Sequence, residues 1–151
     1  MSYKLFYLLT IYFSLTTLYA CSNLKFQNYY GNCEGNNSDG YITLLISNAD
    51  KKNISKSNAE KCAIHLLLFS GISGNEKCQT IIPYLRNETE KNNFKTIENK
   101  FFSKNGDWKS FVRSSNDLNV TNSGYKIVVS KQELLNYLAN KQIIKPLNSG
   151  F

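Results

Sequence analysis

The pattern of apolar and polar positions predicts three strands in the chain. Residues 40–49, GYITLLISNA, form a nearly continuous apolar run rich in β-branched and aromatic side chains, which predicts an interior strand. Residues 125–130 alternate between apolar and polar side chains, which predicts a half-buried strand. Asn122-Ser123-Gly124 predicts a hairpin turn before it, and the segment WKSFVRSS that starts at Trp108 favours a strand over a helical turn.

Three helices are predicted where apolar residues recur at intervals of three and four positions. Each begins with a capping residue followed three positions later by glutamate: Ser57 with Glu60, Asn87 with Glu90, and Ser130 with Glu133. The first is expected to end at Gly71 and Gly74, the second at the segment SKNGD, and the third at Pro146. The second carries Phe94, Ile97 and Phe101 as a single apolar stripe.

The predicted order of elements is strand, helix, helix, strand, strand, helix. This order indicates an α+β fold, a two-layer sandwich with a mainly antiparallel sheet and helices on one face. Residues 40–148 are expected to form this single domain. The core is expected to use apolar residues of every element: Ile42, Leu44, Ala63, Leu66, Phe69, Phe94, Ile97, Phe101, Val112, Ile127, Val129, Leu134 and Leu138.

The first 20 residues have the pattern of an export signal. Lys4 precedes an uncharged apolar stretch over residues 5–19, which is too short to span a bilayer comfortably. Leu18-Tyr19-Ala20-Cys21 resembles the bacterial lipobox, in which the signal is cut before the cysteine and the cysteine is lipidated. We expect cleavage between Ala20 and Cys21 and lipid attachment at Cys21. The alternative is an ordinary signal peptide, cut at the same place from a secreted protein.

Residues 21–39 are polar and rich in Gly and Asn, and we expect them to form a tether between the lipid and the domain. Ser22 follows the cysteine in place of an aspartate. If the chain follows the sorting rule of enteric lipoproteins, which its lipobox resembles, the absence of aspartate at this position implies the outer membrane of a Gram-negative bacterium.

Three cysteines remain if Cys21 carries lipid, so at most one internal disulfide can form. An oxidising compartment would permit it. Cys62 falls on the apolar side of a predicted helix, whereas Cys33 and Cys78 fall in Gly/Asn-rich loops, which favours a Cys33–Cys78 bridge. No CxxC motif and only one histidine are present, so neither a zinc site nor any other cofactor is predicted.

The formal net charge is +7, and arginine occurs only twice. Scattered lysines without clustered arginine argue against nucleic acid as a partner. The positive charge has two explanations. It attracts the protein to an anionic surface, or it reflects a drift of the amino-acid composition that has no functional meaning. Lys95, Lys100, Lys104 and Lys109 could form a basic face, although a solvated face is the usual meaning of such lysines.

Candidate chemistry is sparse. Cys62 and His65 are three positions apart on one predicted helix and could form a thiol–imidazole pair, but a core histidine fits that apolar face better. Four aspartates next to turn residues offer an alternative carboxylate pair: Asp39, Asp50, Asp107 and Asp117. Tyr29, Tyr30 and Trp108 are candidates for a binding surface for an envelope protein or polysaccharide.

Several segments resemble small bacterial envelope lipoproteins that have a lipobox signal followed by one α+β domain. They are AEKCAIHLLLFSGISG (residues 59–74), Phe101-Phe102, DWKSFV, GYKIVVSKQELLNYL and the terminal IIKPLNSGF. The resemblance implies a membrane address through the lipid and implies no activity. We therefore expect a non-enzymatic binding or structural protein of the envelope. The alternative is a secreted hydrolase acting on envelope polysaccharide or peptide.

Overall fold

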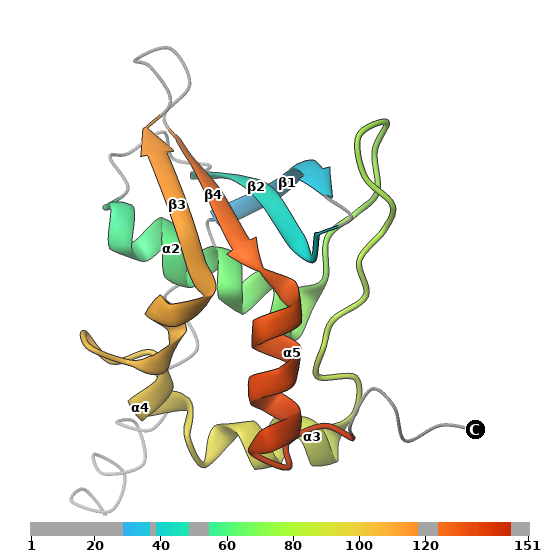
Figure 1. Ribbon diagram of the computed structural model, residues 1–151, viewed down its shortest axis with the longest axis vertical. Helices are drawn as coiled ribbons and strands as arrows, with labels where there is room; N and C mark the ends of the chain where they lie inside the picture. Colours follow the sequence, from blue (N-terminus) through green and yellow to red (C-terminus); the bar gives the residue numbers. More distant parts are fainter. Residues whose placement is uncertain (1–28, 37–38, 49–54, 118–123, 146–151) are drawn as a thin grey trace, which may run out of the picture.

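Four antiparallel strands form an open sheet in the order β1-β2-β4-β3 (Figure 1). The computed structural model describes residues 29–36, 39–48, 55–117 and 124–145, and of Asn36 and residues 114–117 it describes the backbone. The strands are β1 (Tyr29–Asn36), β2 (Tyr41–Asn48), β3 (Val112–Asp117) and β4 (Gly124–Ser130). The predicted interior strand is β2, which pairs with β1 on one side and β4 on the other.

Strand β1 corrects the expectation of a tether over residues 21–39 and of a domain that starts at residue 40. Tyr29–Asn36 pairs with β2 along its whole length, with a bulge between Cys33 and Gly35. Backbone hydrogen bonds to a neighbouring strand are open to any sequence, so a polar, glycine-containing segment can complete the edge of a sheet. Residues 21–28 lie outside the described part of the chain.

One face of the sheet carries the core. Ile42, Leu44 and Ile46 alternate along β2 and are fully buried, and Ile127 and Val129 lie beside them on β4. Residues between them, such as Thr43 and Leu45, are half-buried on the other face. The alternation places one row under the helices and leaves the second row on what we call the outer face.

Helix α2 (Lys56–His65) packs against β2, β3 and β4 on the core face. It begins at Ser55, whose hydroxyl accepts a hydrogen bond from the Asn58 backbone N–H at 3.3 Å. The predicted start at Ser57 and Glu60 is therefore wrong by two residues, because capping geometry is satisfied earlier in the chain.

The helix continues as a π-helical turn, η2 (Leu66–Ser70), and ends at Gly71 as predicted. The Gly71 backbone N–H donates to the Leu66 carbonyl at 2.8 Å. Gly71 has a φ of 73°, a conformation that glycine adopts without steric cost.

The predicted second helix is two short helices. Asn87 caps α3 (Glu88–Lys95) by accepting from the Glu90 N–H at 2.9 Å, as predicted. The chain then breaks at Thr96, whose hydroxyl donates to the Asn93 carbonyl at 2.7 Å, and restarts as α4 (Glu98–Phe101). Competition of a threonine hydroxyl for a backbone carbonyl explains why a continuous apolar stripe did not produce a continuous helix.

The segment before β3 is helical for five residues. Asp107–Phe111 forms a 3₁₀ turn, η3, and the strand starts only at Val112. The expectation of a strand from Trp108 is thus correct for its second half. The hairpin turn predicted at residues 122–123 lies outside the described residues.

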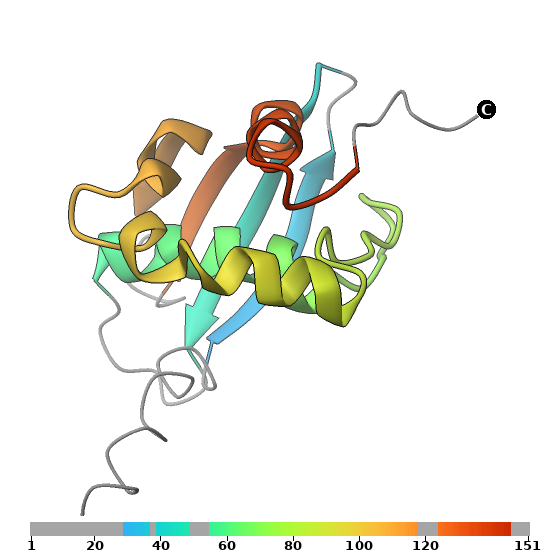
Figure 2. The ribbon, with the colours of Figure 1, turned by 90° about the horizontal axis from the view of Figure 1, so that it is seen from below.

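Helix α5 (Lys131–Asn140) follows β4 directly and contributes Leu134 and Leu138 to the core. Its first backbone N–H, on Lys131, donates to the Gly40 carbonyl at 2.8 Å. The Ser130 side chain makes no capping hydrogen bond, so the start is right but the predicted capping box is not formed. Figure 2 shows α5 end-on, with α3 and α4 running across its axis.

The α+β prediction, with a mainly antiparallel sheet, is confirmed. The predicted order is incomplete, since two strands precede the first helix. Buried core residues come from all four strands or their flanks and from each helix. Pro146, the predicted end of the last helix, lies outside the described residues.

Candidate functional site

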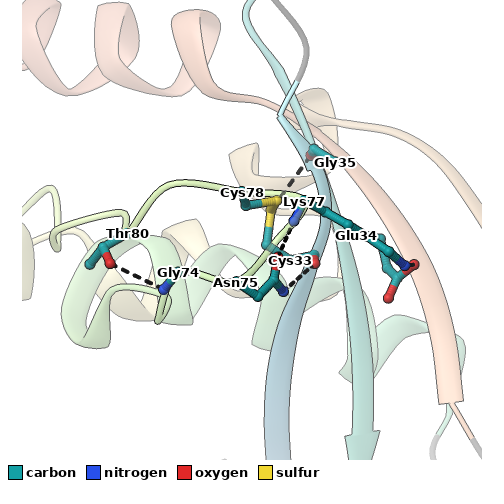
Figure 3. Close-up of a disulfide and its surroundings, with 8 residues drawn as sticks. All are labelled: Cys33, Glu34, Gly35, Gly74, Asn75, Lys77, Cys78 and Thr80. Atoms are coloured by element: carbon teal, nitrogen blue, oxygen red, sulfur yellow. Dashed lines mark hydrogen bonds and ion pairs between the residues drawn. A yellow bond between two sulfur atoms is a disulfide. The ribbon is translucent and has the colours of Figure 1, made fainter.

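The feature that links distant parts of the chain is the Cys33–Cys78 disulfide (Figure 3). It joins β1 to the loop after η2, across 45 positions of sequence, with the two Cα atoms 6.0 Å apart. This is the pairing favoured from the sequence. Both cysteines are buried, and Cys62 is the free cysteine of the described residues.

The loop around Cys78 is held on β1 by two further contacts. Asn75 donates from Nδ2 to the Cys33 carbonyl at 2.8 Å, and Lys77 Nζ lies 2.8 Å from Glu34 Oε2. Because Lys77 donates this bond, the pKa of the Glu34 carboxyl is lowered, with a smaller contribution from the charge of Lys126. The loop thus covers part of the free edge of β1, which would otherwise offer unpaired backbone groups to other chains.

Within the loop, backbone turns shape the segment that carries Cys78. Asn75 and Cys78 exchange backbone hydrogen bonds at 2.9 and 3.2 Å, and the Gly74 N–H donates to Thr80 Oγ1 at 3.1 Å. Asn75, Lys77 and Glu34 were missed as a group from the sequence. The signal that could have pointed to them was the disulfide itself, since it brings residues 33–34 beside residues 75–78.

The residues predicted to carry the lipid and its processing site, Leu18 to Cys21, lie outside the described residues. Among the helices that the structure does describe, none combines the length and the apolar composition needed to cross a membrane.

The binding surface predicted from Tyr29, Tyr30 and Trp108 is not formed. Trp108 is buried, with 1% of its surface exposed, and its indole N–H donates to the Ser103 carbonyl at 2.9 Å. It belongs to η3 beside edge strand β3, whereas the two tyrosines belong to the opposite edge strand, β1. A large aromatic ring gains most by joining the core, which is why Trp108 is a core residue. Tyr30 remains 56% exposed.

The Cys62–His65 pair is not arranged as a nucleophile and base. Cys62 is fully buried, and burial raises the pKa of its thiol to about 12, so the thiol stays protonated and unreactive at neutral pH. His65 packs against Phe69 with the two rings tilted and their centroids 4.7 Å apart, and burial lowers the pKa of His65. The pair therefore serves packing.

The aspartates whose side chains are described, Asp39 and Asp107, have separate structural positions. Asp107 accepts a hydrogen bond from the Tyr137 hydroxyl at 2.8 Å, which joins η3 to α5. Burial and this bond raise the pKa of Tyr137. Asp39 is exposed in the turn before β2, while the side chains of Asp50 and Asp117 lie outside the described part of the structure. No group of three or more His, Cys, Asp or Glu side chains in the described ranges could hold a metal ion.

The predicted lysine set is exposed, as a solvated face requires. They are distributed over α3 (Lys95), α4 (Lys100), the turn that follows α4 (Lys104) and η3 (Lys109). Lys109 places its Nζ 5.8 Å from the centroid of the Trp108 ring, so its cation covers the edge of the core.

No family model, no curated protein and no solved structure matches the chain.

Proposed function

We propose that the chain is a lipid-anchored protein of the bacterial cell envelope. In this proposal residues 1–20 direct export, Cys21 carries the lipid, and the domain acts as a binding or structural module without enzymatic activity. Its membrane is the outer membrane of a Gram-negative bacterium, and its partner is an envelope protein or polysaccharide. No nucleic acid and no cofactor take part.

The observation that carries the proposal is the Cys33–Cys78 disulfide of a chain with an apolar leader. Structural disulfides persist in oxidising compartments such as the periplasm and are rare in the cytosol. Export therefore supplies the condition that this bridge requires. The leader ends in Leu18-Tyr19-Ala20-Cys21, the order that supports lipidation over simple secretion.

The interior of the domain supports a non-enzymatic role. Cys62, the free cysteine in the described part of the chain, and the only histidine are used in packing, and the Asp107 carboxylate is used to join two elements. Groups engaged in this way are unavailable as nucleophile or general base without a rearrangement of the core.

Metabolic labelling with radioactive palmitate tests the proposal in the full-length chain expressed in a Gram-negative host. We expect label on the wild type and none on Cys21→Ala. Cys62→Ala is the matched control, since it removes a different unpaired cysteine and should keep the label. Equal labelling of the wild type and Cys21→Ala would refute lipidation at Cys21, and an intact mass that still includes residues 1–20 would refute cleavage.

A further inference from the structure

The start of β1 sets how far the domain can move from a lipid on Cys21. The strand begins at Tyr29, so eight Cα-to-Cα steps separate the lipidated residue from the sheet. Fully extended, they span at most about 29 Å. The tether is therefore much shorter than an anchor that ends at residue 39 would allow.

That reach is less than the width of the domain. A globular domain of about 120 residues is about 35 Å across. The tether cannot run around the domain to its far side. The end of the sheet where β1 starts therefore stays within about 29 Å of the lipidated residue.

This end of the sheet, which we call the tether end, is defined by the strand register. Tyr29 pairs with Asn48, the last residue of β2, and Ser47 pairs with Gly124, the first residue of β4. The opposite end carries Gly40, whose carbonyl accepts hydrogen bonds from the N–H groups of Lys131 and Gln132 on α5.

The side chains near the tether end suit a headgroup layer. Tyr30 lies on the outer face, in register with Ser47, and is 56% exposed. Lys126 is exposed on the same face, two residues from Gly124. Tyrosine favours the boundary between water and acyl chains, and a lysine there attracts anionic headgroups. The chain from Cys21 onward keeps a formal charge of +6, because Lys4 is the only charged residue before it.

We infer that the domain rests on an anionic bilayer surface with the tether end of its sheet, placing Tyr30 at headgroup level and Lys126 against lipid phosphates. This inference rests on the proposed function, since it takes Cys21 as the lipidated residue. It leaves the opposite end, with Gly40, the start of α5 and Gln132, directed away from the bilayer.

Quenching by brominated lipid tests the orientation in the full lipidated chain. The protein is reconstituted in vesicles of phosphatidylcholine and phosphatidylglycerol whose acyl chains are brominated near the headgroups. Tyr30→Trp places an indole at the tether end, and Gln132→Trp places one at an exposed site of the opposite end. Trp108 is common to both. We expect at least about twofold more quenching for Tyr30→Trp, because an interfacial indole lies within reach of the bromines.

The outcomes separate this inference from the proposed function. Flotation with vesicles of phosphatidylcholine alone, which carry no net charge to attract the domain, reports the anchor: if the lipidated wild type and Cys21→Ala float alike, the anchor itself is refuted. If only the lipidated proteins float and the two indoles are quenched equally, the anchor stands and the orientation is overturned. Replacing Lys126 with Gln should reduce quenching of the Tyr30→Trp indole in vesicles that contain phosphatidylglycerol.

Lengthening the tether tests whether its length holds the orientation. Insertion of about 20 Gly and Ser residues after Asn28 adds a root-mean-square reach of about 25 Å. We expect the difference between Tyr30→Trp and Gln132→Trp to shrink. An unchanged difference would overturn the argument from tether length.

Discussion

Removal of the Cys33–Cys78 disulfide should strongly destabilise the domain. The bridge closes a loop across 45 positions of sequence, and the chain-entropy relation gives about 4 kcal/mol for a loop of that length. Domains of this size are stable by roughly 5–15 kcal/mol. Loss of the bridge therefore removes a large part of the stability, whereas the exposed Lys77–Glu34 ion pair beside it contributes at most about 1 kcal/mol.

Urea unfolding of the chain from Ser22 onward measures this contribution. Trp108 is the only tryptophan and is buried, so its fluorescence reports unfolding of the core. With a urea m-value of about 2 kcal/mol/M, reduction by dithiothreitol should lower the midpoint by about 2 M. Cys33→Ala/Cys78→Ala should show the low midpoint with or without the reductant.

Cys62→Ala is the control, because it removes the free thiol and leaves the bridge. Its midpoint should still fall by about 2 M on reduction. If reduction moves the wild-type midpoint by less than about 0.5 M, the bridge does not constrain the unfolded chain to the extent that the loop length implies. The proposal that the protein is located in an oxidising compartment would then lose the main structural observation that supports it.

Three further changes test individual features of the fold. Gly106→Ala should destabilise by about 1–3 kcal/mol in urea unfolding, since the new Cβ would overlap the Phe101 carbonyl. Gln142→Gly should stabilise by about 1 kcal/mol, because Gln142 has a φ of 57° after α5, and Ala139→Gly within the helix should instead destabilise. His65 has a lowered pKa, so stability is full above about pH 6.5 and falls below it by up to about 1.4 kcal/mol per pH unit. In His65→Gln the urea midpoint should depend less on pH between pH 7.5 and 5.5. If it depends on pH as strongly as in the wild type, the loss of stability at low pH does not come from His65.

Local patterns in the sequence were sufficient for most elements of the fold. The apolar run of β2, the alternation of β4, the Asn87 cap of α3 and the glycine that ends η2 all follow from neighbours within four residues. Periodicity and capping act over that range. The prediction of an export signal and of lipid attachment at Cys21 likewise depends on the sequence alone.

Features that depend on remote partners were found only with the tertiary structure. Strand β1 has a weak pattern, and it becomes a strand because β2 offers a hydrogen-bonding edge and Cys78 is bonded to Cys33. The burial of Trp108 likewise depends on the residues that surround it in the fold, since the type of an aromatic residue does not determine whether it lies on the surface or in the core.

The sequence by itself determined the α+β class, the positions of the main elements and the candidate anchor at Cys21. The tertiary structure decided the fourth strand, the burial of Trp108 and Cys62, and the contacts that hold the Cys78 loop. The physical reason is range: propensity and periodicity are encoded within a few residues, whereas edge pairing, burial and pKa depend on groups that meet only when the chain folds.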